Sequence, residues 1–127
     1  MIEGVLDSSA LLAWFRAEPG GEEVRKVIGR AAISSVNLAE VVTKLIEFGH
    51  DRDEAVEVVR DFPCEVIAFD TEMALLTGAL RAETKRHGLS LGDRACLALA
   101  MRERCPALTT DRAWAQLEVG VEIRMLR

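Results

Sequence analysis

Cysteine and histidine are scarce in this 127-residue chain, and their scarcity excludes several kinds of site. The three cysteines, Cys64, Cys96 and Cys105, are odd in number and lack Cys-x-x-Cys spacing, so we expect neither disulfides nor a zinc site. The two histidines, His50 and His87, fall in a predicted turn and at a predicted helix end, where surface or capping roles are expected. Neither a thiol nor an imidazole is therefore expected to be the centre of the chemistry.

Long apolar runs and a signal peptide are also absent. No apolar stretch approaches the roughly 20 residues that a membrane span requires, and the start of the chain lacks the basic residues of a signal peptide. We therefore expect a cytoplasmic protein that has no membrane partner. The mean hydropathy of +0.12 is high for so small a domain, and apolar surface that stays outside usually meets a partner. We expect a homodimer or a bound regulator.

Two common catalytic frames are missing. Ser8 and Ser9 have no nearby histidine and no Gly-x-Ser-x-Gly frame, so serine-hydrolase chemistry has no support. Gly20, Gly21 and Gly92 lack the spacing and the following lysine of a phosphate-binding loop, so nucleoside triphosphate binding is not expected.

The net charge of −5 argues against a nonspecific binder of polyanions, because contacts from lysine and arginine to phosphates supply most of that affinity. One local basic cluster, formed by Arg81, Lys85, Arg86 and His87, is a candidate for contact with an RNA backbone. The alternative is that this cluster lies at a helix C-terminus, where cations interact favourably with the helix dipole. Both interpretations stay open at this point.

Short apolar segments alternate with amphipathic ones along the chain, and they predict strands and helices in alternation. The predicted strands are residues 2–6, 31–35, 65–69, 107–110 and 121–126. The predicted helices are residues 8–17, 22–29, 37–48, 53–61, 71–88 and 90–104. This alternation with short turns indicates a parallel sheet with helices on both faces, a three-layer α/β/α sandwich. Residues 1–127 are expected to form one domain.

Four acidic residues stand where predicted strands or loops meet helices: Asp7, Glu40, Asp93 and Asp111. Asp7 and Asp111 follow strands, and ligands of open parallel sheets bind beyond the carboxyl ends of the strands. Glu40 and Asp93 fall in the first turns of helices that can point at the same edge. Four carboxylates gathered there would repel one another, so at least one should have a raised pKa unless a divalent cation is bound. The expected chemistry is hydrolysis of a phosphodiester assisted by Mg²⁺ or Mn²⁺.

Each of these acids also has a structural interpretation. Asn37-x-x-Glu40 and Ser90-x-x-Asp93 both fit capping boxes, and the other two acids can cap the helices that follow them. For any single acid, capping is the better interpretation. The joint pattern favours a site, because capping gives no reason for all four to be acidic, nor for Asp7 to stand in an apolar segment where an unpaired carboxylate is costly.

Four segments of the chain, in order, resemble the motifs of the PIN-domain family, in particular the VapC-type toxins of prokaryotic toxin–antitoxin pairs. They are Val5-Leu6-Asp7-Ser8-Ser9, Ser34-Ser35-Val36-Asn37-Leu38-Ala39-Glu40, Leu89-Ser90-Leu91-Gly92-Asp93 and Leu108-Thr109-Thr110-Asp111. The third segment departs mildly from the family pattern, with Gly92 before Asp93 and Arg94-Ala95-Cys96 after it. Any one motif is weak, whereas four in order over nearly the whole chain are fairly specific.

The resemblance implies a five-stranded parallel sheet, dependence on Mg²⁺ or Mn²⁺, and endonucleolytic cleavage of RNA. It also implies that a cognate antitoxin is a partner. The acids of the metal site would be Asp7, Glu40, Asp93 and Asp111. The hydroxyls of Ser9 and Thr109 would orient a carboxylate, a metal-bound water or a phosphate.

Trp14 and Phe15 follow Leu11 and Leu12 so closely that the apolar surface wraps more than half of the predicted helix, which is wider than one core-facing stripe. Core packing is an equally good interpretation of this pattern. The family resemblance favours a groove for an antitoxin, or a dimer interface, on this helix and its neighbours.

A phosphoacceptor receiver domain is the strongest alternative, because it shares the length, the acidic balance and the alternating elements. Asp70, after the predicted strand at 65–69, would then be the acceptor. Against this interpretation, the first strand is followed by one acid rather than a pair, and no lysine follows Lys85. It also leaves Glu40 and Asp93 without a role.

A further alternative is a catalytically silent binding module on the same fold, because a fold does not determine a function.

Overall fold

The protein is built on a five-stranded sheet in which every pair of neighbouring strands is parallel. The computed structural model describes residues Met1–Arg127. The strands are β1 (Gly4–Leu6), β2 (Ala31–Ser34), β3 (Glu65–Ile67), β4 (Ala107–Thr109) and β5 (Ile123–Met125). All five predicted strands are confirmed, although each is one to three residues shorter than predicted. A strand ends where its neighbour stops offering a hydrogen-bonding partner, and that depends on the other strands.

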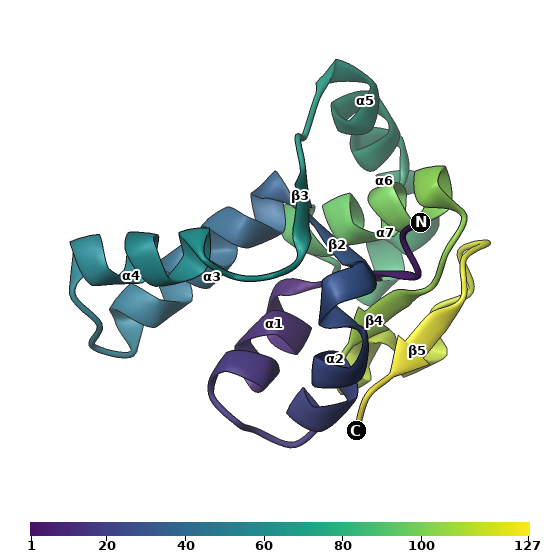
Figure 1. Ribbon diagram of the computed structural model, residues 1–127. Coiled ribbons are helices and arrows are strands. Elements are labelled where there is room, and N and C mark those ends of the chain that lie inside the picture. The colour runs from purple at the N-terminus through teal and green to yellow at the C-terminus, as the bar shows by residue number, and fades with distance from the viewer.

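The strands lie in the order β3-β2-β1-β4-β5, so the direction in which strands are added reverses next to β1 (Figure 1). Such a reversal opens a crevice beyond the carboxyl ends of the two strands that flank it. These two strands are β1 and β4. Asp7 directly follows β1, and Asp111 comes two residues after β4.

Helices cover both faces of this sheet (Figure 1). On one face lie α1 (Ser8–Phe15), α2 (Gly21–Val27), the 3₁₀ helix η1 (Ile28–Arg30), α3 (Ser35–Glu47) and α4 (Arg52–Arg60). On the other lie α5 (Thr71–Ala79), α6 (Arg81–Thr84), η2 (Lys85–His87), α7 (Leu91–Glu103) and η3 (Arg112–Gln116). The predicted three-layer α/β/α sandwich is confirmed. Figure 1 shows the α3–α4 hairpin extending away from the sheet.

Two hydrophobic cores separate the three layers, and strand residues alternate between them. Leu6 and Leu108 pack into the core beneath α1 to α4. Their neighbours Val5 and Ala107 pack into the core beneath α5 and α7. Successive side chains of a strand point to opposite faces of the sheet, so a fully apolar strand contributes side chains to both cores. No helix of the protein has the length and apolar character required to cross a bilayer.

The first two helices approach closely because Gly21 has no side chain. A Cβ at this position would lie 2.5 Å from the carbonyl oxygen of Ala13, a backbone atom that cannot move aside independently. The preceding Gly20 has φ +96°, a conformation that side-chain-bearing residues rarely adopt. The Pro19-Gly20-Gly21 turn therefore sets the packing of α2 on α1.

The single helix predicted for residues 71–88 is wrong in its continuity, because the segment is divided into α5, α6 and η2. Gly78 lowers the helix propensity near the first break. The hydroxyl of Thr84 donates to the carbonyl of Leu80 at 2.8 Å, a bond that tends to bend helices. Gly88, with φ +64°, ends the segment where the end was predicted.

Helix α3 begins two residues earlier than predicted. Ser34 is its N-cap, and the Ser34 hydroxyl accepts a hydrogen bond from the Val36 N–H at 3.2 Å. Asn37 therefore lies inside the helix, and the predicted capping box of Asn37 with Glu40 is wrong. Glu40 lies in the second turn rather than the first. The amide of Asn37 is consequently free to serve another purpose.

Candidate metal site

Asp7 is the only acidic residue in the buried part of the protein, with 3% of its surface exposed. It is the N-cap of α1, and its Oδ1 accepts hydrogen bonds from the Ala10 N–H at 2.8 Å and from the Ser9 hydroxyl at 2.7 Å. Its Oδ2 accepts from the Thr109 hydroxyl at 2.6 Å. The hydroxyls of Ser9 and Thr109 therefore hold this carboxylate in one orientation.

The same two hydroxyls also tie β4 to the start of α1. The Ser9 hydroxyl accepts from the Thr110 N–H at 3.1 Å, and that of Thr109 accepts from the Asp111 N–H at 2.9 Å. The carboxyl ends of β1 and β4 are thus joined by side-chain bonds across the point where the strand order reverses. Asp7 lies at the centre of this network.

Burial raises the pKa of Asp7 from its ordinary 3.8 to about 6, because desolvation disfavours the charged carboxylate. Hydrogen bonds from Thr109, Ala10 and Ser9 act in the opposite direction, and the negative charge of Asp93 raises the pKa further. Asp7 thus has the raised pKa expected of at least one acid, but the main cause is burial, and the repulsion between acids on which the expectation rested is the smallest contribution.

Asp93 lies in the first turn of α7, and the capping box predicted for it is confirmed. The Ser90 hydroxyl accepts from the Asp93 N–H at 3.1 Å, and Asp93 Oδ2 accepts from the Ser90 N–H at 3.0 Å. A helix N-terminus also favours negative charge, both of a carboxylate and of a phosphate group. Capping and a role in a site are therefore compatible at this residue.

Glu40 is half-buried on α3 and faces the start of α7. The side-chain amide of Asn37 donates to Glu40 Oε1 at 2.8 Å and to the backbone carbonyl of Gly92 at 3.0 Å. Sequence reasoning assigned Asn37 only to a cap, because its partner Gly92 is 55 residues away. No local pattern reveals a contact over that separation.

Three of the four predicted acids surround one part of the interior. Cys96 is fully buried on α7, one turn after Asp93. Burial raises the pKa of the Cys96 thiol well above its ordinary value, and the charges of Asp7, Asp93 and Glu40 raise it further. Carboxylates from the end of β1, from α3 and from α7 therefore all lie near enough to this thiol to affect it.

Asp111 is not part of this group. It is exposed, and its carboxylate accepts a hydrogen bond from the Ala113 N–H at 3.0 Å as the N-cap of η3. The predicted capping role is confirmed, although the helix that it caps is a short 3₁₀ helix. Asp111 is connected to Asp7 through the Thr109 hydroxyl, which accepts from one residue and donates to the other.

The acids fit a divalent cation that keeps several of its waters. No three His, Cys, Asp or Glu side chains are already arranged to hold a metal ion directly. All the gathered groups are carboxylates, however, and Mg²⁺ prefers oxygen ligands and usually takes only one or two direct carboxylates. A cation would also offset the desolvation of Asp7 and the repulsion from Asp93. Asp7, Glu40 and Asp93 are therefore candidate ligands, directly or through water.

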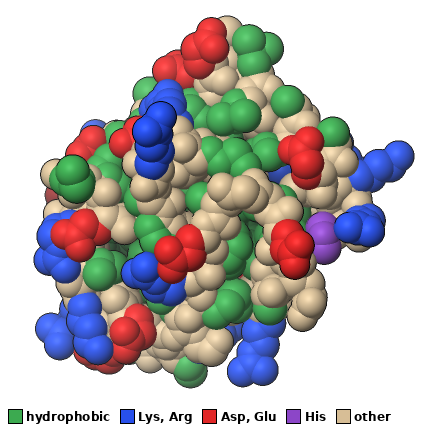
Figure 2. Space-filling model, turned by 90° about the vertical axis from the view of Figure 1, so that its right-hand side faces the viewer, with side chains coloured by type: hydrophobic (Ala, Val, Ile, Leu, Met, Phe, Trp, Pro, Cys, Tyr) green, Lys and Arg blue, Asp and Glu red, His purple; other side chains and the backbone are tan.

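Three residues of the predicted basic cluster are exposed, and the fourth, His87, is half-buried. Arg81, Lys85 and Arg86 take part in none of the ion pairs of the protein. The helix dipole is a weak explanation for this cluster, because α6 and η2 span only four and three residues and few peptide dipoles add up in so short a helix. On the face drawn in Figure 2, basic and acidic side chains are interspersed rather than segregated by sign.

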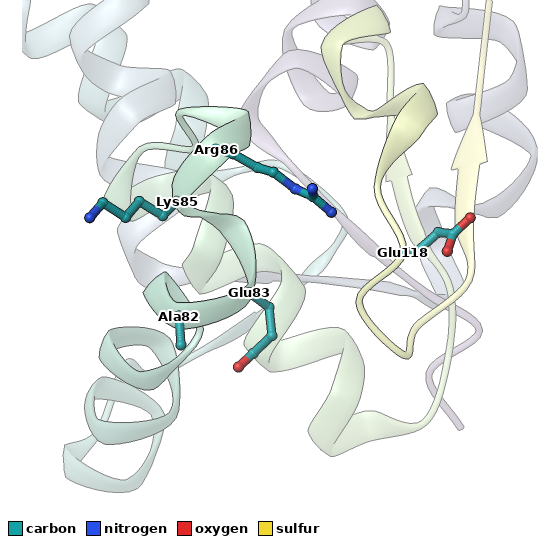
Figure 3. A pocket seen from close by; sticks show the side chains of 5 residues that line it. All are labelled: Ala82, Glu83, Lys85, Arg86 and Glu118. Atoms are coloured by element: carbon teal, nitrogen blue, oxygen red, sulfur yellow. The ribbon is translucent and has the colours of Figure 1, made fainter.

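Lys85 and Arg86 line an open pocket of about 680 Å³ together with Ala82, Glu83 and Glu118. Figure 3 shows Arg86 extending toward the segment that carries Glu118, whereas Lys85 points away from it. The two basic side chains therefore diverge.

Trp14 and Phe15, predicted as a partner surface, are half-buried and pack mainly within the protein. The ring of Trp14 meets that of Phe62 edge-on at 5.1 Å between centroids, and Phe15 lies 5.4 Å from the same ring. Phe15 also lies 6.1 Å from the ring of His50. This cluster joins α1 to the loops before and after α4.

The exposed apolar side chains near this cluster belong to the α3–α4 hairpin. Ile46, Phe48 and Val56 are 42%, 49% and 37% exposed. The guanidinium of Arg16 lies 3.7 Å above the Phe48 ring. Sequence reasoning missed this surface, because it placed Phe48 at the end of a helix without knowing which face of that helix α4 covers.

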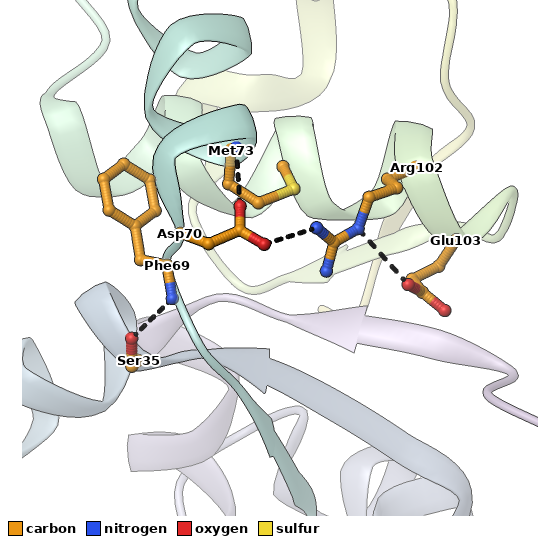
Figure 4. Close-up of polar contacts among 6 residues, drawn as sticks. All are labelled: Ser35, Phe69, Asp70, Met73, Arg102 and Glu103. Atoms are coloured by element: carbon orange, nitrogen blue, oxygen red, sulfur yellow. Dashed lines mark hydrogen bonds and ion pairs between the residues drawn. The ribbon is translucent and has the colours of Figure 1, made fainter.

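Asp70 does not occupy an acceptor site, and the receiver interpretation is wrong. Asp70 caps α5 by accepting from the Met73 N–H at 2.9 Å, and it pairs with Arg102 at 3.5 Å (Figure 4). Nearby, the Phe69 N–H donates to the Ser35 hydroxyl at 3.0 Å. Strand β3 is an edge strand, so Asp70 follows the outer end of the sheet rather than the reversal between β1 and β4.

The protein is therefore an α/β protein with a parallel sheet, and its candidate site consists of acidic residues near the point where the strand order reverses. The family model of the PIN domain matches residues 4–120 of this chain. The chain belongs to the PIN domain family. A search of curated proteins finds no match.

Solved structures of toxin–antitoxin proteins share this fold. DNA-bound VapBC from Salmonella typhimurium is 24% identical, with a TM-score of 0.76 and 100% of both chains covered. VapBC2 from Rickettsia felis, bound to a DNA fragment from its promoter, is 18% identical, with a TM-score of 0.74 and 97% of each chain covered. The sarcin–ricin loop cleaving toxin VapC20 from Mycobacterium tuberculosis is 14% identical, with a TM-score of 0.73, covering 94% of this chain and 99% of that one. At these identities the likeness establishes the fold.

Proposed function

We propose that this protein is a Mg²⁺- or Mn²⁺-dependent endoribonuclease and the toxin of a toxin–antitoxin pair, acting in the cytoplasm as a single PIN-like domain over residues 1–127. The observation that supports this proposal is the buried Asp7 carboxylate at the reversal of strand order, with the Glu40 carboxylate packed against Gly92, the residue before Asp93. Membership of the PIN domain family supports it. So does the similarity of the fold to VapBC complexes and to the toxin VapC20.

The metal would be held by Asp7, Glu40 and Asp93, with Asp111 as a fourth acid tied to Asp7 through Thr109. A divalent cation held there would supply Lewis-acid chemistry, acidifying a water and offsetting negative charge on a phosphate. Ser9 and Thr109 hold the Asp7 carboxylate in one orientation. The N-terminus of α7 adds positive potential beside Asp93, where an RNA phosphate is favoured. No side-chain nucleophile is required.

The metal site is tested by calorimetric titration of Mn²⁺ into the wild type, Asp93→Asn and Asp70→Asn. Asp70 is the control, since its carboxylate also accepts a backbone hydrogen bond at a helix N-terminus, as an N-cap rather than from the first turn, and lies outside the site. We expect Asp93→Asn to weaken binding at least about tenfold, as loss of groups around a metal does, and Asp70→Asn to bind as the wild type does. Equal binding by all three proteins would leave Asp93 as a cap only. Absence of binding, with and without RNA, would favour the silent binding module.

We propose that the RNA backbone contacts Arg81, Lys85 and Arg86, which are exposed and free of ion pairs. Replacing all three by Gln is expected to weaken RNA binding and to lower the slope of log affinity against log salt by about 2, given about 0.7 per phosphate contact on single strands. The measurement is fluorescence anisotropy with labelled RNA across a salt series. Cleavage at saturating RNA should change little.

The control for this prediction replaces Arg25, Lys26 and Arg30 by Gln. These residues lie on the opposite layer in exposed ion pairs, which contribute little stability. It removes the same formal charge. Equal weakening by both triple variants would show a general charge effect rather than a contact surface.

For the antitoxin, we propose the outer face of the α3–α4 hairpin. Ile46, Phe48 and Val56 are exposed there, and a pocket of about 200 Å³ lies between Leu38, Val42, Val56, Val59 and Arg60. An amphipathic helix recognises such a surface through apolar residues spaced along one face. The exposed Leu75 and Leu91, at 65% and 53%, belong to the other layer and are proposed for the homodimer.

A further inference from the structure

We propose that Asn37 and Gly92 are positioning residues for Glu40: Asn37 holds the Glu40 carboxylate by a hydrogen bond, and Gly92 leaves the space that the carboxylate occupies. This inference rests on the proposed function, because it concerns how the proposed metal site acquires its geometry. It assigns a role to two residues that are themselves neither acids nor hydroxyls of the site.

The amide of Asn37 joins two helices at one point. It is 1% exposed, and its Nδ2 donates to Glu40 Oε1 at 2.8 Å and to the carbonyl of Gly92 at 3.0 Å. The first bond lies within α3, and the second crosses to α7. Because Asp93 directly follows Gly92, the same amide sets the place of Glu40 relative to Asp93.

The orientation of this amide is determined by its partners. A carboxylate and a carbonyl are both acceptors, so only the NH₂ group can face them. The remaining oxygen, Asn37 Oδ1, is consequently buried without a hydrogen-bond partner. The two hydrogen bonds that Asn37 donates therefore come together with one unpaired buried oxygen, which costs about 1–3 kcal/mol.

Gly92 is required by Glu40 and not by its own backbone. Its φ is not in the left-handed region, where only Gly20, Gly49, Gly88 and Gly120 lie among the glycines. Gly is also less favourable than Ala within a helix. A Cβ on Gly92 would lie 2.5 Å from both Cδ and Oε1 of Glu40, and closer still to Oε2.

A Cβ added at Gly92 would displace the Glu40 side chain and leave the backbone of both helices in place. The atoms that a new Cβ meets are the far end of a flexible side chain, so the carboxylate can rotate away while both helices stay in place. Gly92→Ala is therefore expected to move the Glu40 carboxylate without lowering the stability of the protein. Gly78 on α5 is the matched control, because a Cβ there meets nothing within 4 Å.

The two side-chain amides of this chain make the role directly observable. Asn37 and Gln116 are the only Asn and Gln residues, so a ¹⁵N spectrum contains only two side-chain NH₂ pairs. We expect the Asn37 pair to shift on Gly92→Ala and on saturation with Mg²⁺. It should also shift on Glu40→Gln, whose spectrum contains a third NH₂ pair from the new Gln. The Kd from this Mg²⁺ titration should equal the Kd from a calorimetric titration of the wild type with the same ion. Gly78→Ala should leave the Asn37 pair unchanged.

The binding test uses Mn²⁺ calorimetry on Asn37→Leu, Gly92→Ala, Gly78→Ala and Glu40→Gln. We expect the first two variants to weaken Mn²⁺ at least about tenfold, as loss of a group that orients a ligand does. Their thermal midpoints should stay close to that of the wild type, and Gly78→Ala should bind normally. If Asn37→Leu fails to fold, Gly92→Ala carries the test alone.

Two failures are distinguishable. Normal Mn²⁺ binding by Gly92→Ala and any folded Asn37→Leu, with weakened binding by Glu40→Gln, would overturn this inference and leave the proposed function intact. Normal binding by Glu40→Gln and Asp93→Asn as well would remove the metal site itself.

Discussion

Asp7→Asn is expected to raise the free energy of unfolding of metal-free protein by roughly 3 kcal/mol near neutral pH. Burial raises the pKa of Asp7 from 3.8 to about 6, and each pKa unit corresponds to about 1.4 kcal/mol between folded and unfolded states. The neutral amide avoids the desolvation of a charge. Its oxygen can still accept from Ser9 and from the Ala10 N–H, while its NH₂ group can donate to the Thr109 hydroxyl.

The pH dependence of this effect has a definite sign. Between pH 3.8 and about 6 the folded protein holds a proton on Asp7 that the unfolded chain has lost. The contribution of Asp7 to stability therefore falls as pH rises through this window and levels off above it. The Asn variant lacks this fall. Its advantage should grow from near zero at about pH 4 to the full value near neutrality.

Urea unfolding of both proteins in EDTA, over this pH range, measures the effect. Asp51→Asn is the control, because Asp51 is an exposed N-cap of α4 and Asn caps helices equally well. That variant should match the wild type throughout. A constant difference across pH, or an Asp7→Asn variant less stable than the wild type near neutrality, would contradict the account of Asp7. Saturating Mg²⁺ should stabilise the wild type and not the variant.

Asp93→Asn is expected to lower the rate of RNA cleavage at least about 10³-fold, which corresponds to about 4 kcal/mol of transition-state stabilisation. The substitution removes the charge of a proposed metal ligand. It retains the cap, since an Asn oxygen can accept from the Ser90 N–H as Asp93 does. The fold should therefore survive the loss of activity.

Initial cleavage rates on a fluorogenic RNA, together with thermal unfolding, check this prediction. EDTA should abolish wild-type cleavage, and excess Mg²⁺ should restore it. Asp70→Asn exchanges a capping aspartate outside the site and should cleave normally. Cleavage by Asp93→Asn within about tenfold of the wild type would remove this residue from the mechanism, and cleavage that resists EDTA would show that the activity needs no metal.

The sequence by itself determined the elements and the layers, because these depend on periodicity and on neighbouring residues. A fully apolar strand such as Val5-Leu6 must be covered on both faces, which already indicates a three-layer sandwich. The capping box of Ser90 with Asp93 is local and was predicted correctly. The acids at the ends of β1 and β4 followed from the same alternation, since parallel strands end at one edge.

Only the tertiary structure decided which groups meet across long separations. Asn37 was predicted as a cap and instead joins Glu40 to a carbonyl 55 residues away. The charges of Glu40, Asp93 and Asp7 all raise the pKa of the same buried thiol, whereas Asp111 stays exposed. Local hydrogen bonds determine where helices and turns form. The pairing of β1 with β4 and the packing of α3 on α7 determine which carboxylates are buried and which lie close enough to affect one another's charge.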